Sequence, residues 1–203
     1  MEKQRKLAAS DRKKIVIRSA IEVFSESNYR VAKITDIAKR SGITDPMIYK
    51  FFASKAELFQ EILKITSRKT IENFLSKDFF TEEKLQTKAQ YRKAIENSMW
   101  TYFSSMETYR RELKIYYQAI SEVDDTDVRK VLIDTYQNYA TFYQSVLKDG
   151  EAEDILDLDI DAETISWDMI GFIIHQSTLF LMDFYKEEDA RKLLQSRVQT
   201  WIP

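Results

Sequence analysis

The chain has 203 residues, with no cysteine, one histidine and a formal net charge of −2. The lack of cysteine excludes a disulfide framework, a thiolate zinc site and a cysteine nucleophile, and a single histidine excludes a metal site built from several histidines of one chain. Only 3 glycines and 2 prolines are present, which argues against an all-β fold, because such a fold needs frequent tight turns.

Three helices are expected at the start of the chain. The first runs from Ser10, a suitable N-cap, to about Asn28, because asparagine tolerates the left-handed conformation that often follows a helix. A second, short helix covers about Ile34–Arg40 and is followed by Gly42, where a sharp turn needs a positive φ. The third helix covers about Asp45–Phe52.

Further helices are expected along the rest of the chain. Capping boxes at Ser54–Glu57 and Thr87–Gln90 predict two helix starts, and the second of these helices extends to about Met106. The remaining helical patterns cover about Thr108–Ser121, Asp127–Lys148, Ala162–Tyr185 and Glu188–Trp201. The acidic run from Asp149 to Asp161 is interpreted as a solvated loop. The sequence therefore predicts an all-α protein.

The charge is divided unevenly along the chain. Residues 1–55 carry 13 basic and 6 acidic side chains, a net of +7, whereas residues 56–203 carry 18 basic and 27 acidic side chains, a net of −9. A basic block joined to an acidic one indicates that the first block meets a polyanion. The alternative is a solvated basic tail, and charge alone does not decide between the two.

The second and third helices form a candidate helix-turn-helix around Ser41-Gly42-Ile43. Ile37 and Ala38 fit the inner face of the first of these helices, and Ile48 and Phe52 fit the inner face of the second. The N-terminal part of the second helix then stays exposed, which is the part of a recognition helix that reaches base edges. An ordinary helical hairpin is the alternative, but the surrounding net charge of +7 favours DNA binding.

The run from Ile37 to Leu58 resembles the DNA-binding domain of the tetracycline-repressor (TetR-like) family, whose pattern is roughly IAxxAGVSxGTLYxYFxSKxxL. The resemblance extends upstream through Ala20, Phe24 and Tyr29, so it covers about residues 10–63. It implies an N-terminal three-helix helix-turn-helix domain, residues 1–55, and a C-terminal helical domain for effector binding and dimerisation, residues 56–203.

The resemblance also implies roles for individual residues. Tyr49 and Lys55 would contact phosphates, and Thr35 would reach a flanking base or phosphate. The remaining residues expected to face double-stranded DNA are Lys33, Thr44, Asp45, Pro46, Met47 and Lys50. Thr44 is also the expected N-cap of the third helix, whereas Lys33 stands where the family usually has a capping threonine. Met47 replaces a small residue of the family pattern, so the operator sequence is not predicted.

A tyrosine-rich region in the middle of the chain is a candidate effector site. Any one of its aromatic residues fits a plain helix core, but a tyrosine hydroxyl in a dry core must find a partner, which favours a cavity. The candidate lining is Trp100, Phe103, Met106, Tyr109, Tyr116, Tyr117, Tyr136, Tyr139 and Tyr143. It contains no basic residue, so we expect a largely apolar or aromatic effector rather than one with a polyanionic head held deep inside, although Arg110 or Arg111 could hold such a head at the mouth. Polar residues that would orient a ligand or face solvent are Glu96, Asn97, Gln118, Glu122, Asp134, Asn138 and Gln144.

The helix expected at Ala162–Tyr185 is apolar almost all round between Met169 and Phe184, so both of its sides must be covered. A second copy of the chain would cover one of them, which predicts a homodimer. The candidate interface residues are Gly171, Phe172, Ile173, Leu194 and Val198. The apolar stretch is shorter than the roughly 20 residues of a membrane span, and the basic N-terminus lacks the apolar segment of a signal peptide, so no membrane partner and a cytoplasmic location are expected.

These observations favour a homodimeric, DNA-binding transcriptional repressor that a small effector releases from its operator. The alternative is a DNA-binding architectural or protein-regulated factor of the same fold without an effector. An enzyme is not expected, because no nucleophile–base pair or metal set is visible, and no cofactor is expected either. His175 lies in an apolar helix and is interpreted as a hydrogen-bonded core or interface residue.

Overall fold

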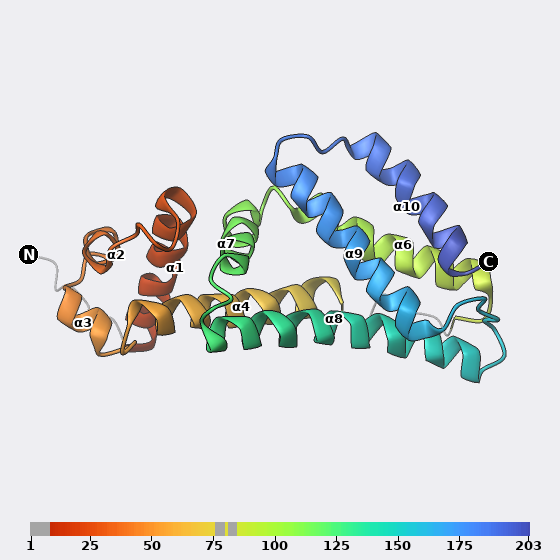
Figure 1. Cartoon of the computed structure of the whole chain (residues 1–203), viewed down its shortest axis with the longest axis horizontal. Coiled ribbons are helices and arrows are strands. Elements are labelled where there is room, and N and C mark those ends of the chain that lie inside the picture. Colours follow the sequence, from red (N-terminus) through yellow and green to blue (C-terminus); the bar gives the residue numbers. More distant parts are fainter. Residues whose placement is uncertain (1–8, 76–79, 81–84) are drawn as a thin grey trace, which may run out of the picture. The chain divides into compact units, whose positions relative to one another are not determined.

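The computed structural model describes residues 9–75, 80 and 85–203, and this part of the chain is helical, without a strand (Figure 1). The expected all-α fold is therefore confirmed. The helices are α1 (Ala9–Ser27), α2 (Ile34–Ser41), α3 (Asp45–Tyr49), α4 (Lys55–Phe74), α6 (Lys88–Ser105), α7 (Arg110–Ile120), α8 (Thr126–Ala152), α9 (Ala162–Leu181) and α10 (Glu187–Trp201). No helix in the described ranges is both long and apolar enough to cross a membrane.

Local signals account for the ends of the first three helices. Asn28, directly after α1, has φ of 60°, and Gly42, directly after α2, has φ of 69°, as predicted. Helix α3 is shorter than predicted and ends at Tyr49 rather than Phe52. The chain tightens there, because the Phe51 N–H donates to the carbonyl of Ile48 three residues back (2.9 Å).

Both predicted capping boxes begin helices. The Ser54 hydroxyl accepts from the Glu57 N–H at 3.0 Å, and the Thr87 hydroxyl accepts from the Gln90 N–H at 3.3 Å. Helix α8, in contrast, extends to Ala152, so the prediction of a loop from Asp149 onward is wrong for its first four residues. Within this last part of α8, a Cβ at Gly150 would lie 2.6 Å from the Leu156 side chain, so the absence of a side chain lets the following loop pack closely against the helix end.

The chain divides into two compact units. Unit 1 consists of Met1–Thr66 and Arg111–Val131, and unit 2 consists of Ser67–Arg110 and Leu132–Pro203. Unit 1 therefore contains the predicted DNA-binding residues 1–55 together with the start of α4 and nearly all of α7. Helices α4 and α8 each contribute residues to both units.

Each unit has its own buried core. In unit 1, the rings of Phe24, Tyr29 and Phe59 form an aromatic cluster in which Tyr29 lies 4.2 Å from Phe59 between centroids. In unit 2, α10 packs against α6, and α6 contacts α9. Leu194 of α10 and Met99 of α6 are completely buried there. Burial of this kind is the main favourable term in folding.

Candidate nucleic-acid interface

The turn between α2 and α3 is fixed by the carbonyl of Ala38. This oxygen accepts from the N–H of Gly42, the N–H of Ile43 at 3.2 Å and the hydroxyl of Ser41 at 3.1 Å. Gly42 adopts the left-handed conformation that the turn requires. The two short helices are therefore joined in a single, well-defined geometry.

Three apolar side chains attach this pair of helices to the core of unit 1. Ile37 of α2 and Ile48 of α3 are fully buried, and Phe52, just after α3, is 2% exposed. The opposite side of the pair contains the residues that were expected to face DNA. Those exposed to solvent are Lys33, Thr35, Thr44, Pro46, Tyr49 and Lys50, and those half-buried are Asp45, Met47 and Lys55. Tyr49 is 51% exposed, so its ring does not belong to the core.

The N-terminal ends of α2 and α3 are not capped by the side chains at their N-cap positions. Lys33 and Thr44 occupy the two N-cap positions with extended backbone, and neither side chain makes a cap hydrogen bond. Thr44 is thus an N-cap by position, as predicted, but its hydroxyl does not satisfy the helix. Uncapped helix N-termini carry partial positive charge and suit phosphate groups.

An ion-pair cluster joins the end of α2 to α1. The guanidinium of Arg40 lies 2.8 Å from the carboxylate of Glu26 and 3.6 Å from that of Glu22. Their hydrogen bond lowers the pKa of Glu26 and raises that of Arg40. Arg111, expected at the mouth of an effector site, lies 3.7 Å from Glu22 and belongs to unit 1. These charges serve contacts within unit 1.

Lys55, at the start of α4, directs its ammonium into the protein. Nζ donates to the carbonyls of Tyr29 (2.8 Å), Ala32 (3.0 Å) and Arg30 (3.3 Å), and it lies 4.7 Å from the centroid of the Tyr29 ring. Burial lowers the pKa of Lys55, and the nearby carboxylate of Glu122 opposes this shift. The phosphate contact expected of Lys55 stays a prediction.

Gln118 and Glu122 also belong to unit 1, although the sequence analysis expected them to orient an effector or to face solvent. The Gln118 amide accepts from the Tyr29 N–H and donates to the Phe24 carbonyl, both at 3.2 Å. The Glu122 carboxylate lies 2.7 Å from Nε of Arg30. Sequence reasoning missed this arrangement, because its partners lie about ninety residues apart and no local pattern marks them.

The candidate effector residues are divided between the two units. Tyr116 and Tyr117 belong to unit 1, and the other seven belong to unit 2. Among those in unit 2, Phe103, Met106 and Tyr143 are buried, whereas Trp100, Tyr109, Tyr136 and Tyr139 are half-buried. Trp100 carries the Arg191 guanidinium 3.8 Å from its ring centroid. Arg110 is paired with Asp183 at 3.0 Å and with Glu107 at 3.2 Å.

The buried tyrosine hydroxyls find partners on neighbouring helices. Tyr143 lies 3.3 Å from the Ser98 hydroxyl, and Tyr139 makes hydrogen bonds with Ser67 and Thr70 of α4. Burial raises the pKa of both tyrosines, that of Tyr139 to about 12. These two hydroxyls therefore take part in packing between helices, and the effector cavity expected around them stays a prediction.

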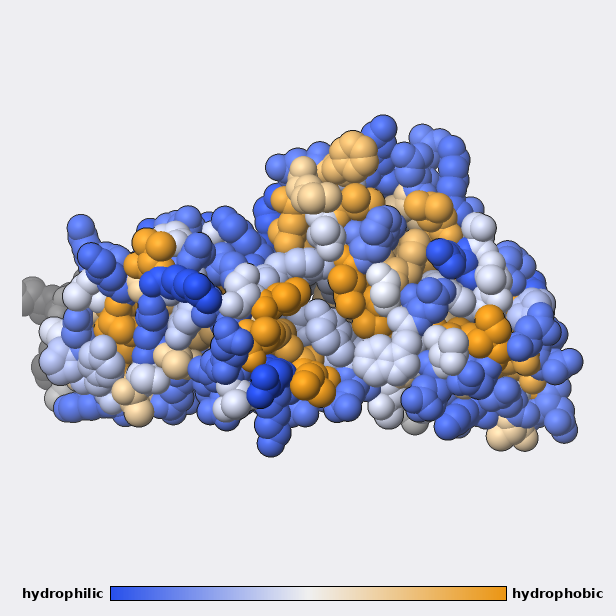
Figure 2. Space-filling view, in the orientation of Figure 1, coloured by the Kyte–Doolittle hydropathy of each residue, from blue (hydrophilic) through white to orange (hydrophobic). Residues whose placement is uncertain are grey.

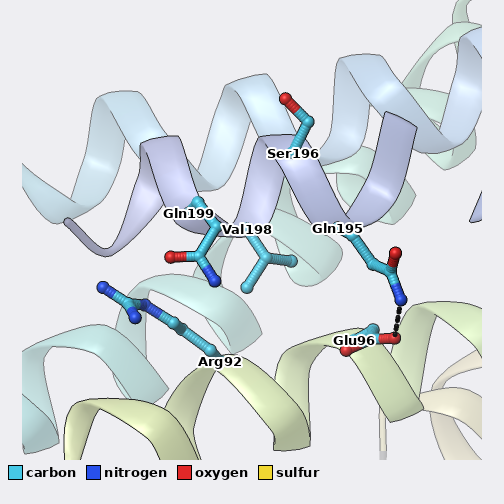
Figure 3. Close-up of a pocket in the computed structure, with 6 residues that line it drawn as sticks. All are labelled: Arg92, Glu96, Gln195, Ser196, Val198 and Gln199. Atoms are coloured by element: carbon cyan, nitrogen blue, oxygen red, sulfur yellow. Dashed lines mark hydrogen bonds between the residues drawn. The ribbon is translucent and has the colours of Figure 1, made fainter. Parts of the chain in front are cut away.

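A pocket of about 450 Å³ lies between α6 and α10 of unit 2 (Figure 3). It is lined by Arg92, Glu96, Gln195, Ser196, Val198 and Gln199. The Gln195 amide donates to Glu96 at 3.4 Å across it. None of these residues is in the candidate aromatic lining, but Glu96 is one of the polar residues expected to orient a ligand or face solvent, and Val198 is a candidate dimer residue. The only signal in the sequence is the spacing of four residues between polar side chains on each helix.

The candidate dimer residues differ in their burial. Phe172, Leu194 and Val198 are buried within the single chain, and the Phe172 ring packs between those of Phe103 and Trp201 at 5.9 and 6.0 Å. Gly171 is exposed and Ile173 is half-buried. Exposed large apolar residues on α9, on α10 and in the segment between them are Trp167, Met182, Phe184 and Leu193. Figure 2 shows hydrophobic residues gathered over α9 near its junction with α10.

A comparison with protein families identifies the fold. Residues 16–62 match the family model described as "Bacterial regulatory proteins, tetR family". This segment contains the buried side chains of Ile37, Ile48 and Phe52 and the exposed residues that were expected to face DNA. Over these residues the chain matches the TetR family of transcriptional regulators. The resemblance inferred from the sequence is confirmed, as are the N-terminal helix-turn-helix and the helical C-terminal region of this family. The family and fold are those of regulators rather than enzymes.

Relatives with similar sequences and solved structures cover most of the chain. The fatty acid metabolism regulator protein of Bacillus subtilis (strain 168) is 22% identical over 171 residues, 84% of each chain. A putative TetR-family transcriptional regulator from Rhodococcus sp. has a TM-score of 0.77 at 14% identity, covering 96% of this chain and 100% of that one. The regulator FadR from Bacillus subtilis, in complex with stearoyl-CoA, has a TM-score of 0.74 at 19% identity, covering 92% and 95%. At these identities the solved structures show the fold.

Proposed function

We propose that this regulator is a homodimeric repressor that binds a pseudo-palindromic operator and is released by a small effector. The observation that carries the DNA-binding part is the separation of α2 and α3 into a buried side and an exposed side. Ile37 and Ile48 are fully buried, whereas the predicted contacts Thr35, Tyr49 and Lys50 are exposed on a block with a net charge of +7. An exposed recognition helix on a basic block suits the major groove.

Dimer formation is proposed through α9 and α10. Large apolar side chains that are exposed on a single chain mark a surface that another molecule covers. Trp167 is 44% exposed, Leu193 is 47% exposed and Met182 is 60% exposed. A two-fold axis would bring the same surface of a second copy onto them. Gly171 and Ile173 stay candidate members, whereas Phe172, Leu194 and Val198 would support this surface from below.

The effector is proposed to be a molecule with a long apolar chain, of the fatty acyl class. The apolar and aromatic character of the candidate lining in unit 2 supports an apolar ligand. The relative from Bacillus subtilis that was solved with stearoyl-CoA supports the acyl class. Because the Tyr139 and Tyr143 hydroxyls are used in packing, the ligand would bind by repacking this region, a shift between two states of the protein.

Two experiments test this function. Selection from a randomised duplex library, followed by titration at several salt concentrations, should give an operator whose affinity falls linearly on a log–log salt plot. Fatty acids, acyl-CoA thioesters and planar aromatic molecules should then be screened by thermal shift. A ligand at a hundredfold excess over its Kd should stabilise the protein by about 2.7 kcal/mol, and the same compound should release the operator.

The outcomes separate the alternatives. Absence of salt-dependent binding to any duplex would refute the DNA-binding function. Operator binding together with no response to any compound class would favour a factor without a small-molecule effector. A compound that stabilises the protein but leaves operator affinity unchanged would support a binding site and refute the proposed release.

A further inference from the structure

The connection between α1 and α2, residues 28–32, is held by side chains from two other helices. Within it, the Ala32 N–H donates to the Asn28 carbonyl at 3.0 Å. We call it the α1–α2 link. It is followed directly by Lys33 and Thr35 at the N-terminal end of α2, two of the residues expected to meet DNA. The position of the link therefore sets where this end of α2 lies.

Lys55 holds the link from the side of α4. An ammonium has three N–H donors, and the structure directs them to the carbonyls of Tyr29, Ala32 and Arg30 at 2.8, 3.0 and 3.3 Å. The Tyr29 ring adds a cation–π contact. In this geometry the Lys55 ammonium stabilises the backbone of the link, because its N–H groups are directed to three carbonyl oxygens of the link rather than outward to a phosphate.

Gln118 holds the link from the side of α7. Its amide oxygen accepts from the N–H of Tyr29 in the link, and its amide nitrogen donates to the carbonyl of Phe24 in the last turn of α1. One side chain thus ties the end of α1 to the start of the link, because an amide supplies both the donor and the acceptor that this requires. Arg30 and Glu122 add an ion pair at 2.7 Å, but Arg30 is 69% exposed and contributes less.

We propose that Lys55 and Gln118 are positioning residues for DNA binding, which fix the α1–α2 link and through it the N-terminal end of α2, and that neither side chain contacts DNA in the complex. The proposal rests on the DNA-binding function argued above. It assigns α7, outside the helix-turn-helix, a direct part in shaping the DNA-binding surface. It also gives Lys55 a role that differs from the phosphate contact expected from the family resemblance.

The salt dependence of operator binding distinguishes positioning from phosphate contact. Lys55→Met and Gln118→Leu should each weaken operator binding about tenfold at fixed salt. The first variant loses the hydrogen bonds from the ammonium to the link, and the second loses the amide bridge between Phe24 and Tyr29. Neither should change the slope of the log–log salt plot. Lys50→Met, at an exposed lysine, is the matched control and should lower the slope by about 0.9 if Lys50 neutralises one phosphate. Because both residues hold the same link, the double variant should lose less than the product of the two single effects.

A local readout separates positioning from general loss of stability. Hydrogen exchange at the Tyr29 and Ala32 amides should accelerate in both variants, whereas exchange at core amides of α1 and α4 should stay slow. Gln118→Glu keeps the acceptor for Tyr29 and loses the donor to Phe24, so its affinity should lie between those of the unmodified protein and Gln118→Leu. Lys55→Arg, which keeps the charge, should recover part of the affinity, and these two milder variants serve if the first two fail to fold.

Several results would overturn the proposal. A salt slope lowered by about 0.9 in Lys55→Met would make Lys55 a phosphate ligand. Unchanged operator affinity in Gln118→Leu would remove Gln118 from the positioning of α2. If the unmodified protein bound no duplex at all, the DNA-binding function would fail and the proposal with it, a result that is distinct from a defect confined to the variants.

Discussion

Two neighbouring leucines of α10 test the distinction between the core of unit 2 and the surface proposed to form the dimer. Leu194 is fully buried in the single chain, whereas Leu193 is 47% exposed. Arg197, one turn after Leu193, pairs with Asp168 of α9 at 3.5 Å, and both of these side chains are half exposed. The two leucine side chains have the same composition and adjacent positions, and they differ in what surrounds them.

The expected effects of the two substitutions differ in kind. Leu194→Ala removes buried methyl groups and leaves a cavity, which costs about 2–5 kcal/mol. In a chain of this length, 1 kcal/mol corresponds to roughly 2–4 °C in melting temperature, so a loss of roughly 4–20 °C follows, without a change in oligomeric state at concentrations where the variant is folded. Leu193→Asp places a charge on the surface that the partner would cover, so it should raise the dimer dissociation constant at least tenfold while the separated chains keep their helical content.

Sedimentation analysis over a range of protein concentrations, combined with thermal melting at two concentrations, measures both effects. The melting temperature of a dimer rises with concentration, and this dependence should disappear in Leu193→Asp when the protein becomes a monomer. Leu193→Ala is the matched control, since it shortens the side chain without adding a charge. The reasoning would be refuted if Leu193→Asp remained a dimer at low micromolar concentration, or if Leu194→Ala dissociated the dimer without any loss of stability.

Three further predictions follow from local geometry. Gly150→Ala should destabilise the protein by about 1–3 kcal/mol through overpacking, because the added Cβ would lie 2.6 Å from Leu156, and urea denaturation should show partial recovery when Leu156→Ala is added. Burial raises the pKa of Tyr139 to about 12, above the ordinary value near 10, so its contribution to stability is complete below about pH 10 and is lost as pH rises toward 12. Between pH 9 and 11.5, denaturation should therefore show a smaller decline in the free energy of unfolding for Tyr139→Phe than for the unmodified protein. Gly42→Ala should cost about 1 kcal/mol because φ is 69°, and operator affinity should fall with it, whereas an unchanged operator affinity would show that the turn geometry is not needed for binding.

The ends of helices were predictable because their signals are local. Asn28, Gly42 and the capping threonine Thr87 each act within a few residues of their own position. The main local failure was the end of α8, because a glycine within an acidic run gave no indication that the helix continues to Ala152.

The burial of individual apolar residues was less predictable. The helix α9 is apolar on most sides, so its sequence does not distinguish the side that packs within the chain from the side left exposed. Phe172 was expected at an interface, but its ring packs between Phe103 and Trp201, which lie on helices far apart in the sequence. Similarly, the tyrosines were correctly expected to need hydroxyl partners, but Ser98 as the partner of Tyr143 follows only from the tertiary packing.

Helix α4 connects the two arguments about DNA binding and effector response. Its first residue, Lys55, holds the α1–α2 link, and further along the same helix Ser67 and Thr70 hydrogen-bond the buried hydroxyl of Tyr139. An α-helix transmits displacement along its axis because each turn is bonded to the next. If the proposed effector repacks Tyr139, replacing Ser67 or Thr70 by alanine should weaken the effect of the effector on operator affinity, as measured by operator titration with and without ligand. Unchanged coupling in both variants would refute a role for these hydroxyls.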